Sequence, residues 1–222
     1  MGISKKTKED CYHIYLLRHG RSLGNENGFL QGQQDVPLTD EGRGQARLLA
    51  ERWSEDQIGF DLIITSPLSR ASETAAIIAK KLHCPVEEDE LLMERNTGSL
   101  SGAKVSRRGD LAENLKFTSP YRFFGGDGEG DWQLYLRAGQ VLFTLMQRDP
   151  GSYLLVSHGG MINQLTHAIL GVPPGPRHKG IGFAMENTGF SRFDYFMNDH
   201  YWGVVTVNNI DHLRKKQSGG ND

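Results

Sequence analysis

HIYLLRHG, residues 13–20, is the part of the chain from which the fold can be deduced. Its first five residues are rich in apolar and β-favouring side chains, which is typical of a short buried strand. Arg18, His19 and Gly20 follow at once, so we expect this strand to end in a loop that carries polar groups. The same pattern occurs twice more, in FDLIIT (residues 60–65) before Ser66 and in YLLVS (residues 153–157) before His158.

Amphipathic helices are expected between these strands. Four apolar side chains within residues 46–53 recur at the spacing of one helical face, and Thr39 is placed to cap the start of that helix. Ser66 is expected to cap the next helix, with Pro67 at its first position. Further helices are expected over residues 132–148 and 161–170, and two final strands over 183–195 and 201–207, separated by a turn at 198–200. This alternation predicts an α/β fold with a mostly parallel central sheet and helices on both faces.

The composition limits the classes of protein that fit. The chain has 222 residues, a formal net charge of −2 and 23% charged residues. The length predicts a single domain over residues 1–222, and the charge argues against a basic nucleic-acid binder or an acidic disordered chain. No run approaches the ~18 apolar residues of a membrane-spanning helix, and the first residues lack the pattern of a secretory signal or a myristoylation site. Cys11 and Cys84 indicate reduced thiols in a cytoplasmic protein, with one disulfide left open.

Two segments differ from the regular alternation. The region from about residue 95 to residue 131 is rich in glycine and mixes charges with aromatic residues. We expect it to be an insertion or lid with short helices rather than a separate domain. The residues from about 214 to 222 are polar and glycine-rich, which predicts a flexible tail.

Chemically useful residues follow the predicted strands. In open parallel sheets, ligands bind outside the carboxyl ends of the strands. Arg18 and His19 follow the first strand, Arg70 lies one turn into the helix after the second, and His158 stands at a helix N-terminus after the third. Glu94 lies where the chain enters the insertion. Guanidinium groups match phosphate oxygens with paired donors, and a helix N-terminus adds backbone N–H groups. These residues predict a phosphate site that contains a nucleophile.

Four motifs then occur in the order of one known family. Residues 17–22, LRHGRS, and residues 35–42, DVPLTDEG, resemble the opening of the histidine phosphatase superfamily, the phosphoglycerate mutase-like proteins. SPLSRASETA (residues 66–75) resembles its second motif, ERN (residues 94–96) its third and VSHGG (residues 156–160) its fourth. A lone Arg-His-Gly is a weak signal, whereas four motifs in order are specific. The resemblance favours the phosphatase branch.

The resemblance implies a role for each of these side chains. His19 would attack phosphorus and form a phosphohistidine, with its other ring nitrogen bonded to a backbone carbonyl. Arg18, Arg70 and His158 would stabilise charge on the three non-bridging oxygens. Glu94 would protonate the leaving group and then deprotonate the attacking water. No metal and no cofactor are implied, because the arginines neutralise the phosphate.

Four further residues are expected to contact phosphate or substrate. Asn25 and Gln31 would do so from the first loop, and Gly159 through its backbone N–H. Arg21 stands where members of the family usually have Glu or Gln, and this extra cation either favours a more anionic substrate or points outward. Residues 125–131, GGDGEGD, resemble a Gly-Glu-Ser stretch of the phosphatases but lack the serine, so no contact is assigned to them.

The motifs leave three functions open. The leading one is a metal-independent phosphomonoester hydrolase that acts on a small phosphorylated metabolite. A cofactor-dependent phosphoglycerate mutase, which is an isomerase, shares all the catalytic residues. In that case Arg107 and Arg108 would help to hold a second phosphate; otherwise they lie on the surface. A catalytically weak regulatory module is disfavoured by the intact histidines and arginines. No nucleic-acid or membrane partner is indicated, and a homodimer through the late aromatic strands around Trp202 is left open.

Overall fold

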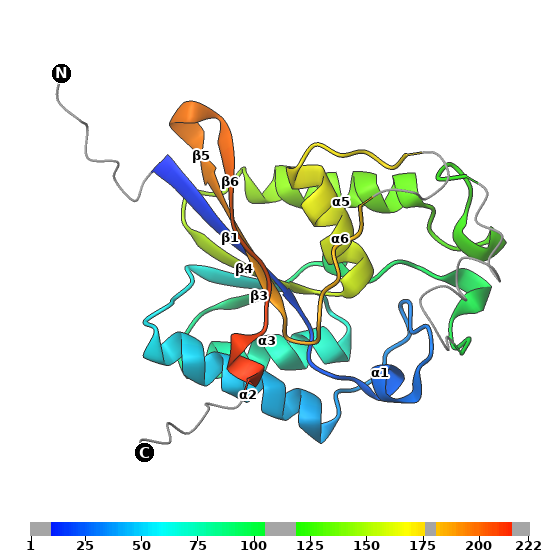
Figure 1. Ribbon diagram of the computed structural model, residues 1–222, viewed down its shortest axis with the longest axis horizontal. Helices are drawn as coiled ribbons and strands as arrows, with labels where there is room; N and C mark the ends of the chain where they lie inside the picture. Colours follow the sequence, from blue (N-terminus) through cyan, green and yellow to red (C-terminus); the bar gives the residue numbers. More distant parts are fainter. Residues whose placement is uncertain (1–9, 105–118, 176–180, 215–222) are drawn as a thin grey trace, which may run out of the picture.

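A six-stranded sheet forms the centre of the computed structural model, which describes residues 10–104, 119–175 and 181–214. The strand order is β3-β2-β4-β1-β5-β6. Strands β3, β2, β4 and β1 are mutually parallel, and β5 pairs antiparallel with both of its neighbours. The mostly parallel α/β fold is therefore confirmed (Figure 1). The strands are β1 (Cys11–Arg18), β2 (Leu62–Thr65), β3 (Val86–Glu88), β4 (Ser152–Ser157), β5 (Phe190–Phe196) and β6 (Tyr201–Asn209).

Helices cover both faces of this sheet, as Figure 1 shows. Helices α2 and α3 pack on one face around the fully buried Trp53, and α5 and α6 pack on the other face around Leu134 and Leu165. The helices are α1 (Leu23–Asn27), α2 (Asp40–Glu55), α3 (Ser69–Leu82), α5 (Asp131–Leu145) and α6 (Gly159–Ile169). Short 3-10 turns are η2 (Glu90–Leu92), η3 (Gly98–Leu100), η4 (Phe124–Gly126), η6 (Met197–Asp199) and η7 (Asp211–Leu213).

The sequence predicted the N-cap of α2 correctly but not the N-cap of α3. Thr39 caps α2, since its Oγ1 accepts a hydrogen bond from the Gly42 N–H at 3.1 Å. The prediction that Ser66 caps α3 is wrong, because that helix begins at Ser69. Asp35, from a distant loop, accepts the Ser69 N–H at 2.7 Å. Ser66 is instead turned into the interior, where its hydroxyl contacts a histidine described below.

Several elements differ from the expectation in their bounds, and one strand was not expected. The strand expected over residues 183–195 begins only at Phe190, because Thr188 has a left-handed backbone (φ 55°) that a strand does not tolerate. Strand β3 was not expected: its three residues are all exposed and two are acidic, so they carry no apolar pattern. The helix expected over residues 132–148 ends at Leu145.

The insertion and the tail are described only in part. Residues 95–104 and 119–131 contain η3 and η4, as short helices were expected there, while Arg107, Arg108 and residues 215–222 lie outside the described residues. Whether 95–131 acts as a lid stays a prediction. Both cysteines are free. In the parts of the chain that the structure covers, every helix is too short or too polar to span a bilayer.

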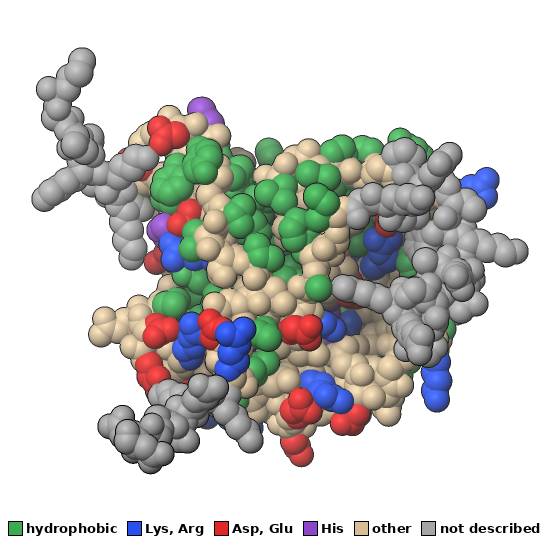
Figure 2. Space-filling view, in the orientation of Figure 1, with side chains coloured by type: hydrophobic (Ala, Val, Ile, Leu, Met, Phe, Trp, Pro, Cys, Tyr) green, Lys and Arg blue, Asp and Glu red, His purple; other side chains and the backbone are tan. Residues whose placement is uncertain are grey.

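The sheet ends on β6, which carries an exposed apolar surface. Tyr201, Val204, Val205 and Val207 are each at least 42% exposed. Figure 2 shows hydrophobic side chains gathered on this face in the region of β5 and β6. A homodimer stays a prediction, and β6 is one of the late aromatic strands for which the sequence left an interface open.

The parallel pairing brings the chemically important strand ends together. Arg18 lies opposite Ser157 in the β1–β4 register, and Thr65 lies opposite Val156 in the β2–β4 register. The three strands therefore end at one level. The loop after β1 then meets the start of α2 closely: a Cβ on Gly42 would overlap the backbone of Arg21.

This close approach predicts opposite effects for two glycines of α2. Gly42→Ala should lower the free energy of unfolding by about 1–3 kcal/mol, because the added methyl forces the backbone of the β1 loop to move. Gly44→Ala is the matched control: nothing lies within 4 Å of a Cβ there, so better helix propensity should raise stability by roughly 0.5–1 kcal/mol. Urea unfolding measures both. Equal effects of the two substitutions would contradict the close contact.

Candidate active site

A cavity of about 580 Å³ opens at the carboxyl ends of β1, β2 and β4. It contains five of the residues to which the sequence assigned chemistry: Arg18, His19, Arg70, Glu94 and Gly159. Asn25 and Gln31 line it as well. An apolar wall made of Phe29, Leu30, Phe124, Phe183 and Met185 completes much of the lining.

His19 is held in one tautomer by the loop that carries it. Its Nδ1 lies 2.7 Å from the Gly20 carbonyl oxygen, which can only accept a hydrogen bond, so Nδ1 carries the proton. The lone pair of the neutral ring is then on Nε2. The loop is fixed in turn, because the Gly20 N–H donates to Thr74 Oγ1 (3.1 Å) and the Asn187 amide donates to the His19 carbonyl (3.0 Å).

The surroundings of His19 keep its ring neutral. The side chain is only 3% exposed. Burial, and then the positive charges of Arg18 and Arg70, hold the pKa of His19 well below its ordinary value. A neutral imidazole beside cationic groups is the state that a nucleophile requires.

Two arginines supply positive charge: Arg18 at the end of β1 and Arg70 in α3. Arg18 Nη1 donates to the Met185 carbonyl at 2.6 Å. Arg70, on α3, is 1% exposed, and its terminal nitrogens donate to the carbonyls of Gln34 and Gly32, both at 2.8 Å. Burial lowers the pKa of Arg70 to about 10, so it remains cationic at neutral pH. Its Nε is buried and has no hydrogen-bond partner among the described residues, so the two carbonyls use only two of the five N–H donors of this guanidinium group.

His158 lies behind the cavity wall rather than on it. It precedes α6, is fully buried, and its ring centroid lies 5.1 Å from that of His19 at an interplanar angle of 57°. Its Nε2 is 2.8 Å from the hydroxyl of Ser66. Burial is the main cause that lowers the pKa of His158 well below its ordinary value, and the positive charges of Arg70 and Arg18 add to it. His158 is therefore neutral and can donate one hydrogen bond.

Glu94 also lines the cavity. Its carboxylate accepts the N–H of Arg95 at Oε1 (2.8 Å) and that of Gly160 at Oε2 (3.1 Å). A Cβ on Gly160 would overlap Oε1, so glycine is required for this approach to the start of α6. The carboxylate therefore has a defined place facing the same cavity as His19.

Of the side chains expected to contact substrate, Asn25 and Gln31 line the cavity, whereas Arg21 lies on the surface. The side-chain oxygen of Asn25 is already used, since it accepts hydrogen bonds from Ser22 and Asn187, so any contact to phosphate comes from its Nδ2 donors. Gln31 is 9% exposed and its Oε1 accepts from the Ser22 hydroxyl at 2.9 Å. Arg21 is not part of the lining: its Nη1 lies 3.4 Å from Glu41 Oε2 on the surface. Of the two readings of Arg21, the outward one fits this placement.

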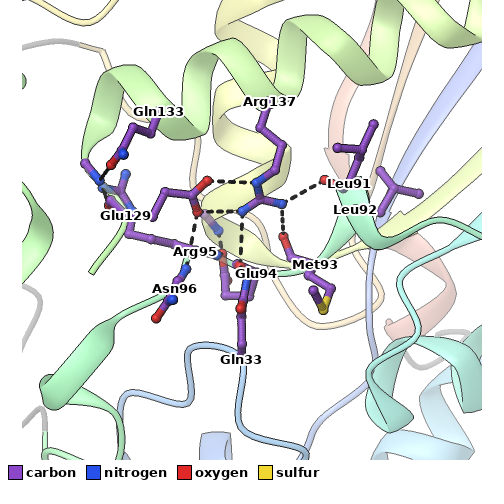
Figure 3. Close-up of polar contacts among 12 residues, drawn as sticks. Gln33, Leu91, Leu92, Met93, Glu94, Arg95, Asn96, Glu129, Gln133 and Arg137 are labelled. Carbon is purple, nitrogen blue, oxygen red and sulfur yellow. Dashed lines mark hydrogen bonds and ion pairs between the residues drawn. The ribbon is translucent and has the colours of Figure 1, made fainter. Parts of the chain in front are cut away.

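The sequence analysis missed several residues that hold the site. Asn187 links the β1 loop to Asn25, but it lies in an irregular segment with no motif. Arg137, in the middle of α5, contacts the segment that carries Glu94 (Figure 3). One signal existed for Arg137: after Asp131 in the first turn, it is the one charged residue of α5. Among the described residues, no three His, Cys, Asp or Glu side chains group so that they could hold a metal ion.

Comparison with known proteins agrees with this geometry. The family model of the histidine phosphatase superfamily (branch 1) matches residues 14–210. A curated relative, "Probable phosphoglycerate mutase GpmB" of Enterobacter sp. (strain 638), is 34% identical over 207 residues, which cover 90% of this chain and 94% of the relative.

Two solved structures share the fold. A phosphoserine phosphatase mutant of Entamoeba histolytica, in complex with phosphoserine, aligns with a TM-score of 0.76 at 26% identity, over 91% of this chain and 100% of that one. A mycobacterial glucosyl-3-phosphoglycerate phosphatase aligns with a TM-score of 0.73 at 25% identity, over 89% and 98% of the two chains. The chain belongs to branch 1 of the histidine phosphatase superfamily, as an enzyme of the phosphatase or phosphoglycerate mutase type.

Proposed function

We propose that the protein is a metal-independent phosphomonoester hydrolase that works through a phosphohistidine on His19. The observation that carries this proposal is the hydrogen bond from Nδ1 of His19 to the Gly20 carbonyl. It leaves the lone pair on Nε2, in a cavity that also holds Arg18 and Arg70. A nucleophile and the cations that neutralise a phosphoryl group then share one site. Activity should accordingly persist when EDTA is present.

The reaction takes place in two displacements. Nε2 of His19 forms a bond to phosphorus while the ester P–O bond breaks, and Glu94 gives its proton to the departing oxygen. Water then attacks the phosphorus, Glu94 takes a proton from that water, and the P–N bond electrons return to Nε2. Arg18 and Arg70, which line the cavity, stabilise the non-bridging oxygens in both steps. His158, which is buried behind the cavity wall beside His19, is not assigned a contact to the phosphate.

The proposed substrate is a small phosphorylated metabolite. The cavity of about 580 Å³ has the size of a small-molecule site. The two structural relatives, a phosphoserine phosphatase and a glucosyl-3-phosphoglycerate phosphatase, support a small phosphomonoester as the substrate. Two free cysteines agree with the reducing cytoplasm as the place of action.

A phosphoglycerate mutase is the second candidate, and the name of the curated relative favours it. Both reactions begin with the same phosphoenzyme. A mutase must then return the phosphoryl group to a bound product instead of to water. Incubation with 3-phosphoglycerate separates the two: a hydrolase releases inorganic phosphate, whereas a mutase forms 2-phosphoglycerate.

Replacing the nucleophile should stop turnover. His19→Ala should lower kcat by at least ~10³-fold, because no other group can form the covalent intermediate. A matched control is His83→Asn on the surface, since Asn tolerates the left-handed backbone that His83 adopts (φ 55°). A quench of the wild-type enzyme with SDS at alkaline pH during turnover should trap a phosphoenzyme that is stable to base and labile to acid, and that His19→Ala lacks. Substantial turnover of His19→Ala would contradict the assignment.

Removing the acid should affect poor leaving groups most. Glu94→Gln should lower kcat/KM for an alkyl phosphate by about 10²–10⁴-fold. The loss should be much smaller with para-nitrophenyl phosphate, whose leaving group needs no proton. Because kcat/KM covers only the steps up to release of the alcohol, slow dephosphorylation does not mask the difference. Equal losses with both esters would argue against proton donation by Glu94.

The two buried histidines should resist protonation. Their lowered pKa values predict that NMR ring signals of His19 and His158 keep their neutral shifts at a pH of about 5.5, where an unperturbed imidazole of pKa about 6.5 is mostly charged. Below pH about 6.5 the two histidines of the unfolded chain bind protons, whereas those of the folded protein do not. The contribution of the two neutral rings to the free energy of unfolding is therefore complete above that pH. It is lost as the pH falls toward the pKa values of the folded state. A ring signal of His19 or His158 that titrates near pH 6.5 would contradict this prediction.

A further inference from the structure

Arg137 makes an unusually complete set of contacts with the chain that carries Glu94. It projects from α5 toward residues 91–94, as Figure 3 shows. Its Nη1 donates to the carbonyls of Leu91 (2.8 Å) and Met93 (2.7 Å), and its Nη2 donates to the carbonyl of Glu94 (3.2 Å). One guanidinium group therefore fixes three carbonyls in the four residues that end at Glu94.

Glu129 binds the remaining donors of Arg137. Its two carboxylate oxygens accept from Nε (2.8 Å) and Nη2 (2.6 Å) of Arg137. With these bonds, all five N–H donors of the guanidinium group are in use. Glu129 Oε2 also accepts the N–H of Asn96 at 3.2 Å, on the other side of Glu94 along the chain. The pair thus holds the main chain both before and after Glu94.

This pair is largely buried, with side-chain exposures of 15% for Arg137 and 14% for Glu129. Buried ion pairs are weak sources of stability compared with apolar residues of the same size, because desolvation offsets their attraction. We therefore attribute the Arg137–Glu129 pair to a need for one fixed geometry of residues 91–96, and not to its contribution to the stability of the protein. Glu94 is the residue of that segment that needs such geometry, because proton transfer requires its carboxylate within hydrogen-bond reach of the leaving oxygen.

We propose that Arg137, neutralised by Glu129, is a positioning residue for proton transfer by Glu94. The inference rests on the proposed function, in which Glu94 is the acid. Arg137 does not line the cavity, so it acts through the main chain and not on the substrate. The two backbone N–H groups that hold the carboxylate, those of Arg95 and Gly160, complete the support from the other end of the side chain.

The test compares leaving groups. Arg137→Met and Arg137→Lys should each lower kcat/KM for an alkyl phosphate by roughly 10–100-fold, because small misplacements of a catalytic group have effects of that size. With para-nitrophenyl phosphate, the change should stay within about threefold, since that ester needs no acid. Lysine keeps the charge but cannot reach three carbonyls and a carboxylate at once, so the charge alone should not restore the alkyl activity.

Two controls distinguish the loss of positioning from a general effect on the structure. Arg148→Met removes another arginine paired with a glutamate, since Arg148 lies 2.6 Å from Glu87, but this pair is exposed and does not touch the Glu94 segment. It should leave both rates unchanged. The double variant Arg137→Met/Glu129→Gln removes the carboxylate charge that the single change would strand in the interior, and it should show the same preference for the good leaving group.

The outcomes separate the two proposals. Equal loss with both esters in folded Arg137 variants, while Glu94→Gln alone is selective, would overturn the positioning role and leave the proposed function intact. A Glu94→Gln enzyme without selectivity would overturn both. Selective loss in the Arg137 variants, together with an unaffected Arg148→Met enzyme, supports the inference.

Discussion

The site depends on a neutral imidazole that shares one cavity with two guanidinium groups. Neutrality comes from burial and from the neighbouring positive charges, which together oppose protonation of His19. The direction of the lone pair comes from the hydrogen bond between Nδ1 and the Gly20 carbonyl. Neither factor suffices alone: a buried ring in the other tautomer would present an N–H to the phosphorus, and an exposed ring would be partly protonated. The cations that favour the neutral ring also attract the phosphate, so one arrangement serves both needs.

The parallel sheet makes this arrangement possible. Because β1, β4 and β2 end at one level, residues that are more than fifty positions apart in the sequence reach one cavity without long loops. The acid comes from a different source: the Glu94 segment is irregular, so its shape depends on contacts from α5 and from the start of α6. The nucleophile is thus fixed mainly by the sheet, and the acid by side chains that hold an otherwise unsupported segment.

This difference explains how much could be predicted from the sequence. The strand ends with Arg18, Arg70 and His158 were predictable, because apolar runs followed by polar residues show where buried strands end, and the motifs could be recognised on them. The role of Ser66 was not, since the bond of its hydroxyl to His158 depends on a tertiary contact across 92 residues. Asn187 carries no local pattern, and the isolated charge of Arg137 within α5 does not show what it contacts, because each residue acts by donating to carbonyls of segments far away in the sequence. Local patterns identify elements and recurring motifs, whereas supporting contacts require the fold.

The stereochemistry at phosphorus tests the central claim most directly. A phosphomonoester made chiral at phosphorus with sulfur and oxygen isotopes can be hydrolysed in labelled water, and the configuration of the released thiophosphate can be determined. Attack by His19 followed by attack of water inverts phosphorus twice, so the account predicts overall retention of configuration. Overall inversion would mean a single direct attack by water, and it would contradict a histidine nucleophile at this site.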